Sequence, residues 1–206
     1  MASECAVVVP LENAEARLPG LHLRLTATLK KLAIPYEILY VDNGSTDRTA
    51  ALVEQFCRQD PAVRGIILSR RFSAQAALTA GLAAAQGRAV VTLDPDLHDP
   101  PEVIPRLLDA WHQGCDVVFA RRRTRPAHRA LDWLGRRLLR LLCETTAPPH
   151  TGHTVLMDRR AVDELNALPE RTRDLAGLRT WVGFRQRVLE YDPPTHLAAS
   201  ARTPVS

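Results

Sequence analysis

Two carboxylates stand one residue apart after an apolar segment, in the string Asp94-Pro95-Asp96. Both can turn toward one hard divalent cation, Mg²⁺ or Mn²⁺, which would then bridge to the oxygens of a diphosphate. His98 would add a nitrogen ligand, and this suits Mn²⁺ better than Mg²⁺. The string alone is a weak signal, because a chain with 13 Asp contains about one such pair by chance. Its place directly after an apolar segment strengthens the prediction of a metal site.

A second polar string, Asp42-Asn43-Gly44-Ser45, follows another apolar segment. An Asn-Gly pair favours a turn, and Ser45 or Thr46 can cap a following helix. Alternatively, Asp42 holds the base or ribose of a bound nucleotide. Capping is compatible with both interpretations, so the residues alone leave them open.

Two groups of arginines also follow apolar segments. Arg70 and Arg71 form the first group, and Arg121–Arg125 forms the second with four arginines. Guanidinium groups bind phosphate in a bidentate manner, so either group can contact a diphosphate or a second anionic substrate. The competing interpretation of each group is a solvated surface.

The charge of the chain points to an anionic partner. The formal net charge is +4, and residues Arg121 to Arg140 contain eight Arg and one Asp. Such a patch favours a nucleotide, a phospholipid or a nucleic acid. A nucleic acid is the weakest of these predictions, because no recognised motif accompanies the patch and few aromatic residues are available for stacking.

Composition and length predict one globular domain in a reducing compartment. The chain has 206 residues, of which 46% are hydrophobic and 24% are charged, and this suits one α/β domain. No apolar stretch approaches the roughly 18–20 residues that cross a bilayer, and the N-terminus lacks the basic region of a signal peptide. The four cysteines show no CxxC spacing and are expected to be free thiols, as in a cytoplasmic protein.

Strand-like and helix-like segments alternate through the first 120 residues. Apolar strands separated by amphipathic helices predict a mostly parallel sheet covered by helices on both faces. Ligands of such sheets bind beyond the carboxyl ends of the strands, where the polar strings above would meet. The predicted strands are 6–9, 36–41, 63–68, 89–93 and 116–119, and the predicted helices are 14–32, 46–59, 73–86 and 100–113.

The sequence of the last third of the chain predicts further helices and one strand. An Arg/Leu helix over 127–144 would either pack on the core or lie on anionic lipid. The remaining segments are a loop over 145–154, helices over 158–168 and 173–182, a strand over 186–191 and a flexible tail over 193–206. Residues 1–192 would form one catalytic domain.

Together, the ordered strings resemble glycosyltransferase family 2, and more narrowly the polyprenyl-phosphate glycosyltransferases. The resemblance covers roughly residues 5–192. The matching strings are Val7–Pro10, Glu37–Asp47, Leu68–Phe72, Ala76–Leu82, Asp94–Glu102, Val117–Arg123, Asp158–Arg160, Leu165–Arg171 and Trp181–Gln186.

This resemblance implies a glycosyltransferase-A fold and a nucleotide-sugar donor, either UDP- or GDP-linked. It also implies a polyprenyl phosphate or similar acceptor, and a peripheral membrane contact or a membrane protein partner. With the arguments above, it gives donor-binding roles to Pro10, Glu12, Asp42, Asn43, Arg70 and Asp94, metal-binding roles to Asp94, Asp96 and His98, and catalytic roles to Asp96, Arg121 and Arg123. The transfer would invert the anomeric centre.

The chain departs from the family pattern at four places, one of which is Ala199–Arg202 in place of a string like Glu-Ser-Lys-Tyr. Leu11–Glu15 replaces the usual Tyr-Asn-Glu, and Asp42-Asn43 replaces the usual Asp-Asp pair. Gly152–Val155 replaces Gly-Asp-Phe-Arg, and this removes an acidic and a basic residue. The alternative prediction is therefore a non-catalytic or partner-dependent relative that binds a nucleotide sugar.

Overall fold

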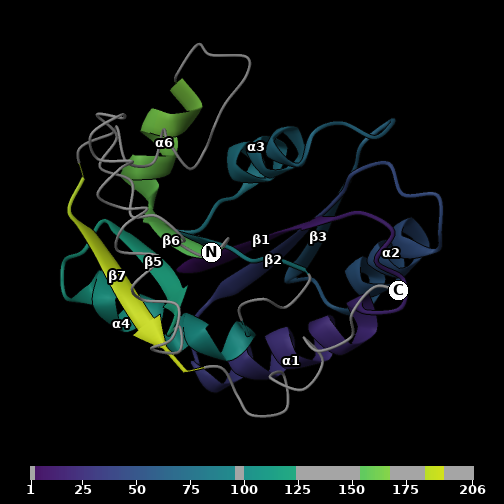
Figure 1. Cartoon of the computed structure of the whole chain (residues 1–206). Helices are drawn as coiled ribbons and strands as arrows, with labels where there is room; N and C mark the ends of the chain where they lie inside the picture. Colours follow the sequence, from purple (N-terminus) through teal and green to yellow (C-terminus); the bar gives the residue numbers. More distant parts are fainter. Residues whose placement is uncertain (1–2, 96–99, 124–153, 168–183, 193–206) are drawn as a thin grey trace, which may run out of the picture.

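The computed structural model describes residues 3–95, 100–123, 154–167 and 184–192, and these build an α/β structure around one sheet (Figure 1). The sheet has seven strands in the order β3-β2-β1-β4-β6-β5-β7, and all are parallel except β6. The strands are β1 (Cys5–Leu11), β2 (Tyr36–Asp42), β3 (Val63–Ile67), β4 (Ala89–Thr92), β5 (Val117–Arg122), β6 (Val155–Asp158) and β7 (Gln186–Tyr191). The predicted, mostly parallel sheet is confirmed.

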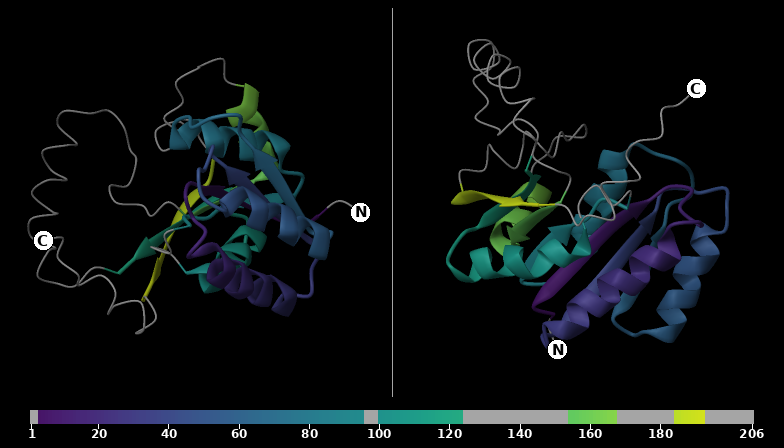
Figure 2. Two further views of the ribbon diagram at one scale, coloured as in Figure 1. Left: turned by 90° about the vertical axis from the view of Figure 1, so that its right-hand side faces the viewer. Right: turned by 60° about the horizontal axis from the view of Figure 1, so that its bottom comes forward.

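Helices cover both faces of the sheet, as the apolar strands predict (Figure 2). The side chains of a strand alternate between faces, so Val7 and Val9 pack on one layer while Ala6 and Val8 pack on the other. One layer holds α1 (Leu18–Lys31), α2 (Thr49–Gln59) and α4 (Ile104–His112), which follows the 3-10 turn η1 (Pro101–Val103); the other holds α3 (Ala74–Ala84) and α6 (Arg159–Ala167).

The sequence prediction missed strand β6, since it assigned nothing to 155–157 between a loop ending at Thr154 and a helix beginning at Asp158. The predicted helix is present as α6, one residue shorter at each end. The four residues of β6 pair antiparallel with both β4 and β5, so that Leu156 lies opposite Val91 and Val118. So short a segment carries no periodicity of its own, and its partners are distant in sequence. Because β6 lies between them, β4 and β5 are about 10 Å apart rather than adjacent.

The starts of two helices show how capping residues are used. Ser73 caps α3 as predicted, since its side chain accepts a hydrogen bond from the Ala76 amide at 3.2 Å. Helix α2 begins only at Thr49, three residues later than predicted, because Ser45 and Thr46 bond to Asn13 instead.

Several predictions fall outside the described residues. They are the Arg/Leu helix over 127–144, most of the loop over 145–154, the helix over 173–182 and the tail over 193–206. Within the described residues, no helix combines the length and the apolar character needed to span a membrane.

Candidate functional site

One edge of the sheet gathers the polar strings that the sequence singles out. Six of the seven strands run the same way, so their carboxyl ends share this carboxyl edge, as do the loops that follow them. The edge comprises residues 10–15, 42–47, 68–73, 94–95, 121–123 and 190–192. It contains the predicted site residues Pro10, Glu12, Asp42, Asn43, Arg70, Asp94, Arg121 and Arg123, whereas Asp96 and His98 lie outside the described residues.

Pro10 and Asp94 lie where β1 and β4 part. The last pair between these strands is Val8 with Thr92, followed by a hydrogen bond from the Leu93 amide to the Val8 carbonyl at 3.0 Å. Strand β1 continues beside β2 beyond this point, whereas β4 does not. Pro10 therefore lies where no residue of β4 would pair with a backbone N–H, so the N–H that proline lacks is not missed. The chain connections run in opposite directions along the sheet from β1 and β4, and ligands of open α/β sheets bind at such a switch point.

The loop after β2 is bonded to the loop after β1. Asp42 is buried at 1% exposure and accepts a hydrogen bond from the Ser45 hydroxyl. That hydroxyl accepts a hydrogen bond from the backbone N–H of Asn13 at 2.9 Å. The side-chain oxygen of Asn13 in turn accepts a hydrogen bond from the backbone N–H of Thr46 at 2.9 Å. Ser45 and Thr46 therefore form a turn that fixes Asp42 at the edge, and they do not cap α2.

Asn43 connects the loop after β2 to the loop after β3. Its buried side chain accepts a hydrogen bond from the Phe72 amide and donates one to the Phe72 carbonyl, both at 2.9 Å. The next residue, Gly44, has a φ of +65°, and a Cβ there would lie 2.3 Å from the carbonyl carbon of Arg70. Only glycine allows this approach, so the two loops are held together closely.

The loop after β3 presents a cation and an aromatic ring to solvent. The Arg70 guanidinium lies 4.3 Å from the centre of the Phe72 ring, and both residues are exposed. Arg71 Nε pairs with Glu12 Oε1 at 2.8 Å, which ties this loop to the end of β1. Contact between Arg70 and a diphosphate stays a prediction.

The described residues contain one of the three predicted metal ligands. Asp94 is half-buried at the switch point, and its carboxylate is a suitable ligand for a hard divalent cation. Among the residues with defined positions, no group of three or more His, Cys, Asp or Glu is arranged to hold a metal. Further along the chain, the Glu102 carboxylate accepts two hydrogen bonds from the Arg24 guanidinium of α1, at 2.8 and 3.0 Å. These bonds hold η1, which contains Glu102, against α1.

At the ends of β5 and β7, the predicted phosphate-binding arginines have acidic partners. Arg121 pairs with Glu190, which lies opposite it in the parallel register. Arg123 lies 3.7 Å from the Glu190 carboxylate and 3.2 Å from the Asp192 carboxylate. Sequence reasoning missed both acids. It predicted the strand over 186–191, but nothing in the sequence indicated that this strand lies beside β5.

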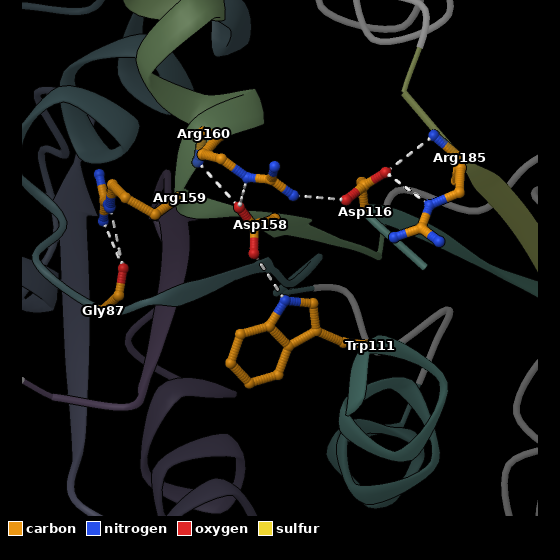
Figure 3. Close-up of polar contacts among 7 residues, drawn as sticks. All are labelled: Gly87, Trp111, Asp116, Asp158, Arg159, Arg160 and Arg185. Carbon is orange, nitrogen blue, oxygen red and sulfur yellow. Dashed lines mark hydrogen bonds and ion pairs between the residues drawn. The ribbon is translucent and has the colours of Figure 1, made fainter. Parts of the chain in front are cut away.

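The opposite edge of the sheet holds a cluster that we term the amino-edge clamp (Figure 3), consisting of Trp111, Asp116, Asp158, Arg160 and Arg185. Asp116 is 7% exposed and accepts bonds from Arg160 Nη2 at 2.8 Å, the Arg185 amide at 3.0 Å and Arg185 Nε at 3.3 Å.

Asp158 completes this clamp. It accepts bonds from Trp111 Nε1 at 2.9 Å and from the amide and Nε of Arg160 at 3.0 and 3.1 Å. Burial raises the pKa of Asp158, but the bonds from Trp111 and Arg160 outweigh it and hold the pKa below its ordinary value. The clamp joins α4, α6 and three strands, and its groups bond to one another.

Known proteins similar to this chain are glycosyltransferases. The family model described as glycosyl transferase family 2 matches residues 6–168. An uncharacterized glycosyltransferase of Synechocystis is 39% identical over 199 residues, which cover 93% of this chain and 62% of that protein. The bactoprenol glucosyl transferase of Shigella phage SfV is 32% identical, with 90% of this chain and 62% of that protein covered. The undecaprenyl-phosphate 4-deoxy-4-formamido-L-arabinose transferase of Pseudomonas fluorescens is 36% identical, over 81% of this chain and 50% of that protein.

Solved structures share the fold at lower identity. Glucosyl-3-phosphoglycerate synthase from Mycobacterium tuberculosis, in complex with Mn²⁺, UDP and phosphoglyceric acid, has a TM-score of 0.65 at 20% identity, over 96% of this chain and 74% of that one. A mannosyltransferase from Pyrobaculum calidifontis, in complex with GDP-mannose and Mn²⁺, has a TM-score of 0.62 at 19% identity, over all of this chain and 66% of that one. The predicted glycosyltransferase-A fold is confirmed. The chain spans 50–62% of the length of the three curated relatives described above.

Proposed function

The chain belongs to glycosyl transferase family 2, and from this premise we propose that it moves a sugar from a nucleotide-sugar donor to a polyprenyl phosphate or similar lipid phosphate. The observation that carries the proposal is that Glu12, Asp42, Asp94 and Arg121, which follow or end four different strands, all lie along the carboxyl edge. Relatives named for bactoprenol and undecaprenyl phosphate support the acceptor class.

The donor would occupy the switch point between β1 and β4. We assign its nucleoside to Pro10, Glu12 and Asp42, with Asn43 keeping the surrounding loops in place and Arg70 reaching toward the diphosphate. Asp94, together with Asp96 and His98, would hold Mg²⁺ or Mn²⁺. A divalent cation there would neutralise charge on the departing nucleoside diphosphate. Mn²⁺ and UDP or GDP-mannose in the two structures of similar fold support this assignment.

The acceptor needs cations more than it needs a base. A phosphate monoester has a second pKa near 6, so it is already mostly dianionic at neutral pH. Arg121 and Arg123 would offset its repulsion from the donor diphosphate. A phosphate oxygen would then attack the anomeric carbon from the face opposite the nucleotide. The bond to the diphosphate oxygen would break as the new bond forms, which inverts the configuration.

A lipid acceptor places this reaction at a membrane, and we propose a peripheral position on its cytoplasmic face. The predicted Arg/Leu helix over 127–144 supplies basic and apolar residues for that contact. Flotation with anionic liposomes at low salt tests the proposal. We expect the chain to float with vesicles that contain anionic lipid and not with neutral ones, and failure to float with either would contradict a direct membrane contact.

The enzymatic proposal is tested by incubating the protein with undecaprenyl phosphate, Mn²⁺ and labelled UDP-glucose, UDP-GlcNAc or GDP-mannose. We expect one donor to yield a labelled lipid, and the same donor to raise the melting temperature in the presence of Mn²⁺. A donor that raises the melting temperature without any transfer would favour the non-catalytic alternative. That alternative gains support from Val155, which is buried in β6 and carries no charge where the family pattern has arginine. If no donor binds, both forms of the proposal are wrong.

A further inference from the structure

The arginine pair at the end of β5 already holds carboxylates of the same chain. Glu190 pairs with both Arg121 and Arg123, and Asp192 pairs with Arg123. The strand register sets this arrangement, since Arg121 and Glu190 are opposite each other in the β5–β7 ladder. Two positive groups and two negative groups thus face each other, and they largely cancel.

The carboxylates of these ion pairs are more exposed than those of the amino-edge clamp, although Arg121 itself is only 28% exposed. The side chains of Glu190 and Asp192 are 42% and 72% exposed, and that of Arg123 is 59% exposed. Exposed ion pairs contribute little to stability, because water solvates both partners well when they separate. A phosphate dianion, by contrast, forms strong bidentate bonds with guanidinium groups. The carboxylates are therefore partners that such an anion can displace.

The backbone around Glu190 does not depend on its carboxylate. Arg106 Nη2 donates to the Glu190 carbonyl at 3.1 Å, and the Arg123 amide donates to the Tyr191 carbonyl at 2.9 Å. The β5–β7 ladder runs from Val117 to Arg122 on one strand and from Gln186 to Tyr191 on the other. Replacing the carboxylate should leave β7 in place, which makes the side chain testable by itself.

We propose that Glu190 and Asp192 act as an internal counter-anion that sets the affinity and charge selectivity of the Arg121–Arg123 pair for a phosphate monoester dianion. While the site is empty, the carboxylates hold the guanidinium groups in place and screen them from weak monoanions. A dianionic phosphate exchanges with them, and the displaced carboxylates turn to water. This inference rests on the proposed function only for the acceptor's identity, since the exchange itself requires only a phosphate.

The test measures dissociation constants by calorimetry at pH 8, with inorganic phosphate in one arm and farnesyl phosphate in the other. Removing one negative charge beside the arginines should tighten phosphate binding roughly three- to tenfold in Glu190→Gln and about twofold in Asp192→Asn. Arg121→Gln should weaken binding in both arms. The matched control is Asp163→Asn, which removes an exposed carboxylate paired with Arg159 on α6 and should change neither constant.

If Glu190→Gln binds both inorganic phosphate and farnesyl phosphate equally well or more weakly than the unmodified chain, with unchanged circular dichroism, the inference is overturned. Asp192→Asn repeats the test at a second position if Glu190→Gln does not fold. A change confined to farnesyl phosphate identifies a lipid headgroup as the ligand, whereas equal changes in both arms identify phosphate alone; either result supports the exchange. The sugar-transfer assay on the unmodified chain is independent of this test. If the chain transfers sugar but Glu190→Gln does not bind phosphate more tightly, only this inference is wrong. If Glu190→Gln binds phosphate more tightly but the chain transfers no sugar, only the proposed function is wrong.

Discussion

The two edges of the sheet use the same types of charged residue for different purposes. At the amino edge, Asp116 is almost fully buried and receives three hydrogen bonds from Arg160 and Arg185. At the carboxyl edge, Arg121 and Arg123 pair with the Glu190 carboxylate, which is exposed to water. An aspartate whose acceptor sites are filled by surrounding elements stabilises the fold, whereas an exposed pair stays available for exchange. The burial of the carboxylate decides whether a cluster of charged residues stabilises the fold or stays available for exchange.

The comparison predicts that the two edges can be damaged independently. A change to the amino-edge clamp should lower stability and leave transfer intact. A change to a charged group at the carboxyl edge that is not buried should alter transfer or anion binding and leave stability intact.

The largest effect is expected from Asp94→Asn. This change removes the negative charge from the proposed metal ligand Asp94 while keeping its size, and transfer should fall roughly 10²–10³-fold, as when a single group that stabilises the transition state is lost. The urea midpoint should barely move. Initial rates at saturating donor and Mn²⁺ measure the effect, and Asp163→Asn serves as the charge-matched control. Undiminished transfer by Asp94→Asn would remove Asp94 from the site.

Asp116→Ala should show the opposite pattern. It removes the acceptor of the Arg185 amide, Arg185 Nε and Arg160 Nη2, although Arg160 Nε still bonds to Asp158, and the free energy of unfolding should fall by about 2–3 kcal/mol. Urea denaturation measures that loss. Transfer at a temperature where the variant is folded should stay within twofold of the unmodified protein. A selective loss of transfer would show that the edges are coupled, contrary to the comparison.

Asn43→Asp should affect both stability and donor binding, each modestly. A carboxylate still accepts from the Phe72 amide, but it cannot donate to the Phe72 carbonyl, and it comes within about 3.5 Å of the Glu12 carboxylate. We expect a loss of about 1–2 kcal/mol in unfolding free energy and a several-fold higher KM for the donor. The matched change Asn166→Asp, on α6, should leave KM unchanged. Equal KM values for the two variants would show that the loop connection has no role in binding.

The smallest effect concerns acid stability at the clamp. The pKa of Asp158 is lower in the folded chain than its unfolded value of about 3.9. The contribution of ionised Asp158 to the stability of the fold is therefore present above the pKa of the unfolded chain, and it is lost as the pH falls through the pKa of the folded chain. Trp111→Phe removes one bond to this carboxylate and should cost about 0.5–1.5 kcal/mol at pH 7.

The acid-unfolding midpoint of Trp111→Phe should also move to higher pH, as followed by circular dichroism. If the midpoint moved to lower pH, the assigned cause of the Asp158 pKa shift would be wrong.

The sequence predicts the parts of the site that follow strong local signals. Asp42 and Asp94 each come directly after a run of apolar residues in the sequence, so their common edge follows from the predicted parallel sheet. The pairing of Arg121 with Glu190 could not be predicted, because it depends on two strands 69 residues apart lying side by side. Asn43 has the same difficulty, since its bonds to Phe72 depend on how two loops approach each other.

Strand β6 shows a second limit. Its four residues have no pattern that separates a strand from a loop, and only the space between β4 and β5 gives it a place. The amino-edge clamp depends on this strand as well, because Asp158 is its last residue. Short, fully buried strands are therefore where tertiary structure overrides local sequence.

The reversed direction of β6 determines where the chain leaves and re-enters the sheet. The chain leaves the carboxyl edge after Arg123, and it re-enters the sheet at the same edge, where the Thr154 carbonyl accepts a hydrogen bond from the Ala120 amide at 3.0 Å. The segment between them, 124–153, is therefore joined to the sheet at the carboxyl edge through both of its ends. Its length and sequence can vary without any change in the strand order or in the residues that we propose bind the donor.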